Sequence, residues 1–429
     1  MQLFSVVRLL CNIIIKMGIF PGAKAYFRDT TKVFSNERNP QKPNVIVTDV
    51  MLLLYMFDAY RSIKESESTA YEPYVGSMRS LARFLWRRIA HPDNAEQIET
   101  WQTHVVTFDV PGCSPRAKEA TQIKRSTRSA PSIEGEFHDF DDDAPLPKPF
   151  STCLRTPGFL GKVVERLFPL LEEMYVSCKS FWGDLILQWR NIPTRLFRHS
   201  ESGVASRELL QHAHSVTSIG EGDMSICYWV QYFNADATLI ITKDTDMILL
   251  LSLVAPSKGK TLTLRLDYGV TIDYIDIVSF QSWLATRYGS VYDGFIYCVL
   301  QGNDYVEKVT KGCGPVVHLD TLAERCCMGQ APVMRVHNGT FECNEHVLKA
   351  RLQTACVRGS LIPTADVCIR QALWYLFYAL HAVNGSNMAS NMCASMHNEL
   401  SLFGWTTSQN NTILHASRVT QTPSFSLTN

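Results

Sequence analysis

A stretch near the middle of the chain joins a strand of the buried type to two acidic residues. Residues 238–253 are TLIITKDTDMILLLSL, in which an apolar, β-branched run leads into Asp244 and Asp246 and then into a second apolar run. The first run has the length and composition of a buried strand. Unpaired carboxylates beside such a strand would cost several kcal/mol, so a divalent metal is the partner that this pattern favours. In the alternative interpretation, one aspartate caps the next helix and the other faces water.

An apolar run followed by an aspartate also occurs twice nearer the N-terminus. Residues 44–49, NVIVTD, end in Asp49, and residues 104–109, HVVTFD, end in Asp109. In an open parallel sheet the residues that follow the strands meet at the carboxyl edge, where ligands bind. The three strand-and-aspartate patterns therefore predict acidic side chains gathered at one edge of a sheet.

Three further acids stand at predicted element ends. Glu221 and Asp223 lie where a loop enters a helix, and Asp304 follows an apolar run. Seven acids in one crevice could not all stay ionised without cations between them. Two Mg²⁺ or Mn²⁺ ions roughly 4 Å apart would hold them, because these metals prefer hard oxygen ligands. The predicted metal ligands are Asp49, Asp109, Glu221, Asp223, Asp244, Asp246 and Asp304.

The remaining periodicity indicates an α/β chain without internal repeats. The apolar pattern predicts a further strand at residues 262–267 and helices at residues 50–63, 74–90, 158–200, 226–233, 275–288 and 316–380. Helix 74–90 carries a basic face of Arg79, Arg83, Arg87 and Arg88, for which a solvated surface is the plainer interpretation.

Composition excludes several classes of protein. A chain of 429 residues with 46% hydrophobic and 19% charged residues is long enough for one large α/β domain or two smaller ones. The 13 scattered cysteines favour a reducing, intracellular compartment. Arg8 interrupts the apolar N-terminal segment, and no stretch reaches the roughly 18 apolar residues of a membrane span. The zero net charge does not exclude nucleic acid, because clustered acids would cancel basic patches.

Basic residues follow Asp109 directly, next to the candidate metal site. They are Arg116, Lys118, Lys124, Arg125 and Arg128, and their position raises the chance that they meet phosphate. Residues 129–150 are acidic and proline-rich, which indicates a mobile loop, and Asp141, Asp142 and Asp143 within it are expected to be solvated. Gly312 and Gly314 mark a turn between helices in which backbone amides can approach a phosphate.

In this order, the acids and their flanking strands resemble the flap endonuclease/XPG-like structure-specific 5′-nucleases, a family with a PIN-like α/β fold. The resemblance runs from Met17 to about Pro315 and rests on MGIFPGAKAYF, VIVTDVMLLLYMFDAYR, VVTFDVPGCSPRAKEATQIKRSTR, GEGDMSICYWVQYFNADATLIITKDTDMIL and LQGNDYVEKVTKGCGP. It implies a central, mostly parallel sheet flanked by helices, then a helix–turn–helix and a helical C-terminal region. The divergence also resembles that of outlying flap-endonuclease-like proteins of large DNA viruses.

The resemblance assigns a role to each candidate residue. Asp49, Asp109, Glu221 and Asp223 would hold chiefly one metal ion, and Asp244, Asp246 and Asp304 the other. The groups that would act on the nucleic acid are Tyr55, which would stack on a base, Arg61, which would contact a phosphate, and the arch cations Lys118 and Arg125, with Arg116 as the competing choice for the arch. Tyr55 as a core aromatic and the two arch cations as a solvated face are the alternatives.

The chain also departs from the family. Asp223 stands where a glutamate is usual, and Lys308 where the helix–turn–helix has a small residue, which leaves the K⁺ ion and the duplex contact of that motif open. The expected organisation is an N-terminal extension (1–16), a first nuclease part with the basic segment (17–128), the acidic loop (129–150), a second nuclease part (151–300), the helix–turn–helix and helical region (301–383) and a flexible tail (384–429).

The leading hypothesis is a two-metal 5′-nuclease that cuts branched or nicked DNA in replication, repair or recombination. The expected protein is intracellular, nuclear and monomeric, has no membrane contact and carries no sliding-clamp motif in its tail. Two alternatives stay open: an RNA-cleaving enzyme of the same fold, of the host-shutoff kind, and an inactive nucleic-acid-binding scaffold. A zinc site at Cys327, Cys343 and His346 is a minor alternative, because their spacing fits no zinc pattern.

Overall fold

The protein is described from a computed structural model. The residues described are 19–37, 42–69, 73–90, 102–108, 141–154, 156–178, 183–189, 192–199, 205–209, 221–254, 256, 259–267, 271–337, 340–383, 405–407 and 412–415. The helices are α2 (Ala23–Thr31), α3 (Val50–Glu67), α4 (Met78–Ala90), α6 (Phe150–Cys153), α7 (Pro157–Ser177), α8 (Gly222–Phe233), α9 (Asp246–Ser252), α10 (Ile277–Tyr288), α11 (Val291–Val299), α12 (Pro315–Thr321), α13 (Glu345–Thr354) and α14 (Ala365–Val383), with a π-helical segment at Leu322–Cys327.

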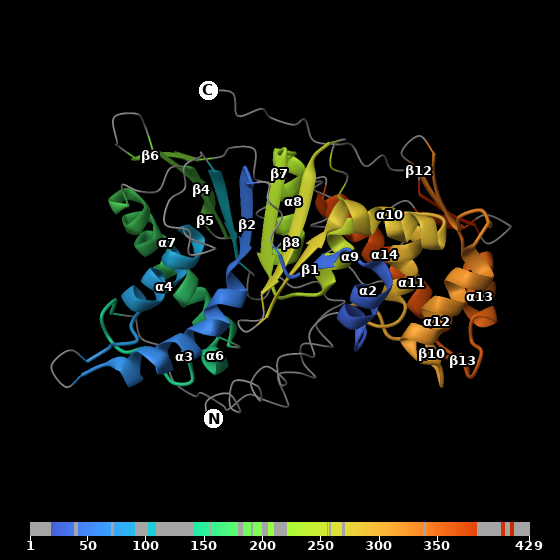
Figure 1. Cartoon of the computed structure of the whole chain (residues 1–429), viewed down its shortest axis with the longest axis horizontal. Coiled ribbons are helices and arrows are strands. Elements are labelled where there is room, and N and C mark those ends of the chain that lie inside the picture. Colours follow the sequence, from blue (N-terminus) through green and yellow to red (C-terminus); the bar gives the residue numbers. More distant parts are fainter. Residues whose placement is uncertain are drawn as a thin grey trace.

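A twisted sheet forms the middle of the molecule (Figure 1). Within the described residues its strands lie in the order β1 (Phe34–Ser35), β9 (Ile272–Asp276), β8 (Thr261–Asp267), β7 (Ala237–Thr242), β2 (Val45–Asp49), β3 (Gln102–Thr107), β4 (Gly183–Trp189), β5 (Ile192–His199) and β6 (Ala205–Leu209). The five central strands, from β8 to β4, run parallel, and the strands at both margins are antiparallel. The α/β class and the parallel sheet centre are thus confirmed.

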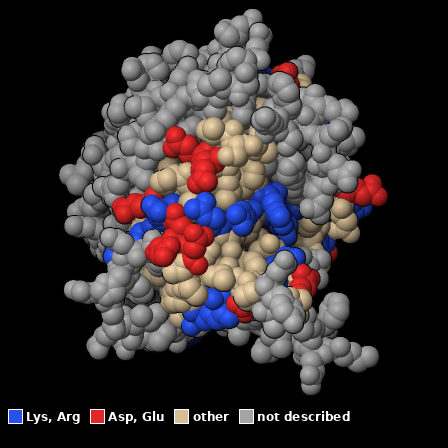
Figure 2. Space-filling model, turned by 90° about the vertical axis from the view of Figure 1, so that its left-hand side faces the viewer, with Lys and Arg blue, Asp and Glu red and all other residues tan. Residues whose placement is uncertain are grey.

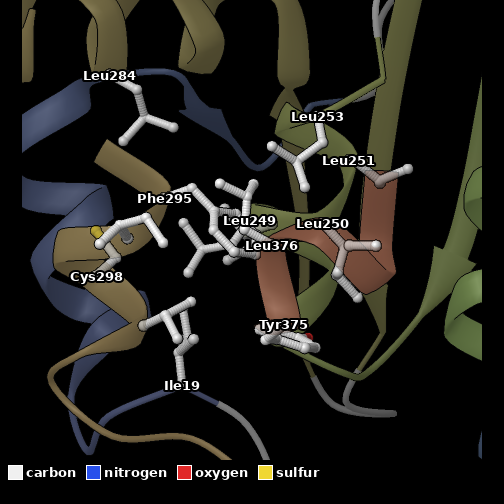
Figure 3. Close-up of a cluster of buried hydrophobic side chains, with 14 of the residues drawn as sticks. Ile19, Leu249, Leu250, Leu251, Leu253, Leu284, Phe295, Cys298, Tyr375 and Leu376 are labelled. Atoms are coloured by element: carbon white, nitrogen blue, oxygen red, sulfur yellow. The ribbon is translucent and has the colours of Figure 1, made fainter. Parts of the chain in front are cut away.

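Helices cover both faces of the sheet because each central strand is apolar on both sides. Val47 of β2 and Ile240 of β7 face one core, which α2 and α8 to α14 complete; the neighbouring Ile46 and Ile241 face a second core formed with α3, α4, α6 and α7. Figure 1 shows the two helical layers on opposite sides of the sheet, and Figure 3 shows the first core, where leucines of α9 meet α11 and α14. The sheet is therefore buried except at its ends.

The structure corrects two predicted helices and adds a strand. The helix expected over residues 158–200 ends at Ser177, and residues 183–189 and 192–199 form β4 and β5 instead. The helix expected over residues 316–380 is interrupted by an antiparallel hairpin of β11 (Met334–His337) and β12 (Thr340–Asn344). Strand β9 was not predicted. The predicted strands at 44–49, 104–109 and 262–267 and the helices at 50–63, 74–90 and 275–288 are confirmed with shifted ends.

Small sheets brace the C-terminal part. Strands β14 (Trp405–Thr407) and β15 (Thr412–His415) extend the hairpin, so these seven residues of the predicted tail are ordered into a sheet. Strand β10 (Thr310–Lys311) pairs with β13 (Ser360–Leu361). Buried Asp293 fixes the hairpin to α11, because its carboxylate accepts the backbone N–H groups of Val333 and Met334 at 2.7 and 2.8 Å.

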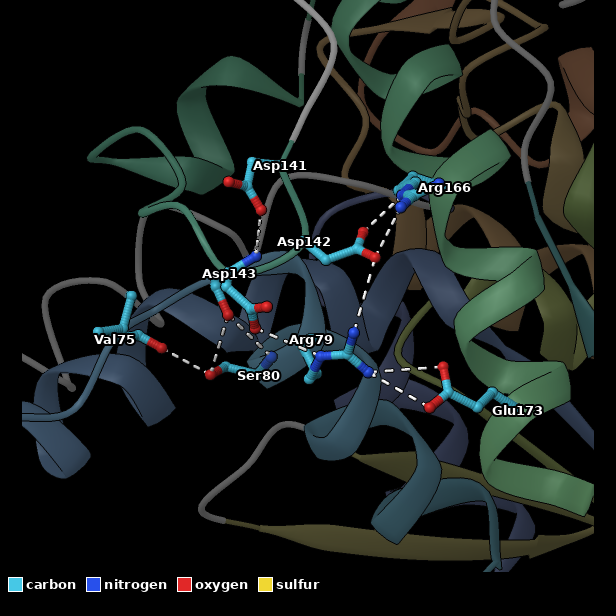
Figure 4. A network of polar contacts seen from close by, with 9 residues as sticks. Val75, Arg79, Ser80, Asp141, Asp142, Asp143, Arg166 and Glu173 are labelled. Atoms are coloured by element: carbon cyan, nitrogen blue, oxygen red, sulfur yellow. Dashed lines mark hydrogen bonds and ion pairs between the residues drawn. The ribbon is translucent and has the colours of Figure 1, made fainter. Parts of the chain in front are cut away.

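The acidic residues after the proline-rich loop are not simply solvated. Asp142 forms a two-pronged ion pair with Arg166 of α7, at 2.5 and 2.6 Å, and Asp143 lies 3.3 Å from Nε of Arg79 (Figure 4). Arg79 also reaches Glu173 of α7 at 3.4 Å. Figure 2 shows Lys and Arg side chains in a band across this face with acidic groups beside it. The basic face predicted for α4 is thus partly neutralised, whereas Arg83, Arg87 and Arg88 are exposed.

None of the helices in the described ranges has both the length and the apolarity required to cross a bilayer.

A buried arginine joins α3 to the segment that precedes α6. The Arg61 side chain is 6% exposed; it donates to Glu65 at 2.9 Å and to the carbonyl of Leu146 at 2.9 Å. Gly76 lies directly against this guanidinium, because an added Cβ would come within 2.3 Å of Arg61 Nε. These contacts make Arg61 a structural link between two parts of the chain.

Replacing Arg61 with methionine is expected to lower the free energy of unfolding by about 1–3 kcal/mol, because the buried carbonyl of Leu146 loses its donor. Urea denaturation followed by circular dichroism measures this change. Lys64→Met on the same helix is the matched control, since Lys64 is an exposed partner of Glu67 and its loss should leave the midpoint near that of the wild type. Equal effects of both substitutions would contradict the structural role of Arg61.

Candidate functional site

Three helices begin at the carboxyl edge of the parallel strands, and each begins with an acid from the predicted set. Asp49 is the N-cap of α3, Glu221 is the N-cap of α8, and Asp246 opens α9. Asp223 lies in the first turn of α8, as its spacing predicts. The N-terminus of a helix carries a partial positive charge, so it stabilises carboxylates in this position. The fold therefore places these acids where backbone dipoles favour them.

The Thr242 hydroxyl joins two of the acid-bearing loops. This side chain is fully buried at the end of β7; its Oγ1 donates to Asp49 Oδ2 at 2.9 Å and accepts the N–H of Asp244 at 3.1 Å. The Asp49 Oδ1 atom accepts the N–H of Met51 at 2.9 Å. Asp49 at the end of β2 and Asp244 after β7 are thus brought together as the sheet topology predicts.

The two aspartates of the central stretch are held by the backbone between them. Asp244 Oδ1 accepts the N–H of Asp246 at 2.8 Å, and Asp246 is 5% exposed. Asp49 and Asp244 therefore do accept the backbone N–H groups of the capping interpretation, each through Oδ1. This does not exclude metal binding, because a carboxylate has two oxygens with about four lone-pair sites.

Two stacked tyrosines lie against the acids. The Tyr305 hydroxyl donates to Glu221 Oε2, and the rings of Tyr305 and Tyr375 are stacked with centroids 4.3 Å apart. Burial raises the pKa of the Tyr375 hydroxyl well above its usual value, and the charges of Asp246, Asp223, Glu221 and Asp244 raise it further. These four acids therefore lie within electrostatic range of one buried hydroxyl, which shows that the structure gathers them.

The loop that carries Asp304 is tightly ordered. It follows α11, and the Asn303 side chain accepts the N–H groups of Tyr305 and Val306 at 2.9 and 2.8 Å. Gly302 adopts a φ of 105°, which only glycine takes easily. Asp304 is 9% exposed and directly precedes Tyr305, the partner of Glu221.

The donor set has the chemistry of a site for Mg²⁺ or Mn²⁺. Asp49, Glu221, Asp223, Asp244 and Asp246 offer hard carboxylate oxygens at one edge, whereas the described cysteines are mostly buried elsewhere. No group of three or more His, Cys, Asp or Glu side chains in the described ranges is arranged to hold a metal ion. The same finding covers the zinc alternative, in which Cys327 and Cys343 are buried but His346 is exposed. The predicted ligand Asp109 lies outside the described residues.

Tyr55 lies beside the central stretch and has a cation above its ring. The Nζ atom of Lys243 is 4.9 Å from the ring centroid, a cation–π distance. Tyr55 is half-buried on α3, so its ring is neither fully within the core nor fully exposed. The sequence prediction missed Lys243, although its place between β7 and Asp244 is a signal that could have identified it.

The glycine turn and its lysine form a compact loop. Gly312 adopts a φ of 75° and Gly314 precedes α12, so the predicted turn between helices is confirmed. The Lys308 ammonium donates to the carbonyl of Cys313 at 2.6 Å. A side-chain cation thus occupies a carbonyl of the turn to which the family resemblance assigns a K⁺ ion.

The remaining predicted residues are not placed. Lys118 and Arg125, expected to act on the scissile phosphate, and Arg116, Lys124 and Arg128, expected to contact nucleic acid, all lie outside the described residues. Arg61, predicted to contact a phosphate, is placed and makes the buried contacts given above.

No protein-family model matches the chain, and no curated protein matches it.

Substituting Thr242 with valine is expected to lower the free energy of unfolding by about 1–3 kcal/mol, because Asp49 loses a donor and the N–H of Asp244 loses an acceptor. Chemical denaturation of the purified variant measures the loss. Thr238→Val is the control, since Thr238 is buried at the opposite end of the same strand, away from the acids. A Thr242 variant no less stable than this control would show that the hydroxyl does not hold the two loops.

Buried His318 should make stability depend on pH. Its Nε2 lies 2.9 Å from the carbonyl of Leu352, its Nδ1 lies 3.0 Å from Gln301 Nε2, and burial lowers the pKa of the ring. The unfolded chain therefore binds more protons, and stability falls as the pH drops below the ordinary histidine pKa of about 6.5. His318→Asn should flatten this dependence between pH 7.5 and 5.5 in urea titrations, whereas His346→Asn, at an exposed site, should retain it.

Proposed function

We propose that the chain is a divalent-metal-dependent phosphodiester hydrolase with a PIN-like fold, of the flap endonuclease/XPG-like type, acting on branched or nicked DNA. The observation that supports this proposal most is the convergence of acids from β2, α8 and the loop after β7 around Thr242 and Tyr375. Carboxylates separated by long stretches of sequence meet at the edge where open parallel sheets bind ligands.

The residues would divide the work as follows. Asp49, Asp109, Glu221 and Asp223 would hold one Mg²⁺ or Mn²⁺ ion, and Asp244, Asp246 and Asp304 a second. When bound, the two ions supply a more acidic water and neutralise charge on the scissile phosphodiester. Tyr55 and Lys243 border the same edge, where an aromatic face and an ammonium suit a base and a phosphate. Lys118 and Arg125 would add positive charge at the phosphate.

Helix capping alone is a weaker explanation of the acids. A carboxylate at a helix N-terminus gains typically 0.3–1 kcal/mol. Two like charges 4 Å apart repel by about 4 kcal/mol at an effective dielectric constant of 20. The gain from the helix ends is therefore smaller than the repulsion that clustering brings, and a bound cation offsets the difference. Localisation in the nucleus and a monomeric state belong to the same proposal.

Replacing Asp244 and Asp246 together with alanine should lower Mg²⁺-dependent cleavage of a labelled 5′-flap duplex at least about 1,000-fold, because the double variant loses two carboxylates of the ion-binding edge. Denaturing electrophoresis of the products over time gives the rates. EDTA should abolish cleavage by the wild type. The absence of cleavage by the wild type, or equal cleavage by the double variant, would contradict a nuclease.

The control for this experiment is Asp276→Ala. Asp276 is a helix-capping aspartate of α10, whose side chain accepts the N–H groups of Val278 and Ser279 at 3.0 and 3.2 Å, and it is exposed. This variant loses a cap, as the double variant does, but keeps the edge acids, so its rate should stay at the wild-type level. Competition between matched RNA and DNA substrates distinguishes the RNA-cleaving alternative, because a preference for RNA would reverse the assignment.

A further inference from the structure

A tyrosine from the Asp304 loop contacts the carboxylate of α8 directly. The Tyr305 hydroxyl donates to Glu221 Oε2, and both side chains are buried, with Glu221 3% exposed and Tyr305 6% exposed. A hydrogen bond to one oxygen of a carboxylate fixes its orientation and leaves the second oxygen for a cation. Tyr305 is not among the residues that the sequence predicts for the site.

The C-terminal helix holds the Tyr305 ring in turn. Tyr375 of α14 stacks on it at an interplanar angle of 20°, and Trp374 lies 6.4 Å from it by ring centroids. Tyr375 is 2% exposed, so neither ring can turn away without leaving the core. The stack therefore restricts Tyr305 to the position from which its hydroxyl reaches Glu221.

We propose that Tyr305 is a positioning residue for the metal ligand Glu221 and that Tyr375 of α14 fixes Tyr305 by stacking. The inference rests on the proposed function, since it treats Glu221 as a ligand. Partners that orient metal ligands in this way typically contribute 10- to 100-fold to metal affinity. Helix α14 would thereby take part in building the ion site although it carries none of the predicted ligands.

The test is Mn²⁺ binding, measured by isothermal titration calorimetry on the full chain. Tyr305→Phe keeps the ring and its stack but removes the hydroxyl, and it should weaken Mn²⁺ binding about 10- to 100-fold. Tyr175→Phe is the matched control. Its buried hydroxyl donates to the carbonyl of Gly183 at 2.7 Å, at the opposite end of the sheet, so its loss should lower the unfolding temperature without changing Mn²⁺ affinity.

A double-mutant cycle separates positioning from general stability. In a Glu221→Gln background the added Tyr305→Phe change should weaken Mn²⁺ binding by less than about twofold, because the effect acts through Glu221. Equal Mn²⁺ affinity of Tyr305→Phe and the wild type, or the same fold loss in both backgrounds, would overturn the inference and leave the proposed function intact. Failure of the wild type to bind Mn²⁺ would instead overturn the metal site and this inference with it.

Tyr375→Leu provides a second variant if Tyr305→Phe does not fold. It removes the stacked ring while leaving the Tyr305 hydroxyl in the chain, so Mn²⁺ affinity should fall severalfold in the wild-type background and stay unchanged with Glu221→Gln. An unchanged affinity in the wild-type background would show that stacking does not position Tyr305.

Discussion

The arrangement of the acids depends on the hydroxyl of Thr242. This single buried group accepts the N–H of Asp244 and donates to Asp49, so it connects the ends of two neighbouring parallel strands. Since β2 and β7 pair in register over Val45–Thr48, the positions of their ends are set by the sheet. The loops that carry the acids thus take their geometry from the most rigid part of the molecule, which is where a site for precise ligands is best placed.

Capping and metal ligation are compatible in this arrangement. The capping interactions use Oδ1 of Asp49 and of Asp244, and they orient each carboxylate relative to a helix end. A carboxylate that is already oriented loses less conformational freedom when it binds a cation. The feature that made the central stretch ambiguous in sequence, an aspartate at a strand-to-helix junction, is therefore consistent with both roles at once.

Local sequence pattern predicted the strands that end in acids and the helices that follow them, because hydrophobic period and element length agree there. It failed for β4, where GDLILQW is a short apolar run that periodicity cannot distinguish from a buried helix. The hairpin of β11 and β12 was missed, although Asn338 and Gly339 between the two strands are a hairpin signal in the sequence. The contacts of Tyr305 with Glu221 and Tyr375 depend on tertiary packing, so no local pattern announces them.

The burial of α14 links the C-terminal region to the acidic edge. Tyr375 and Leu376 lie in the same core as Ile240 of β7 and Met224 of α8, and Figure 3 shows α14 among the leucines of α9. The helix is buried along most of its length, with Trp374 and Tyr378 stacked at 5.2 Å. Because interiors are close-packed, a shift of α14 would move Tyr305, and with it Glu221 at the start of α8. The predicted segments 151–300 and 301–383 thus act as one folding unit around the acids.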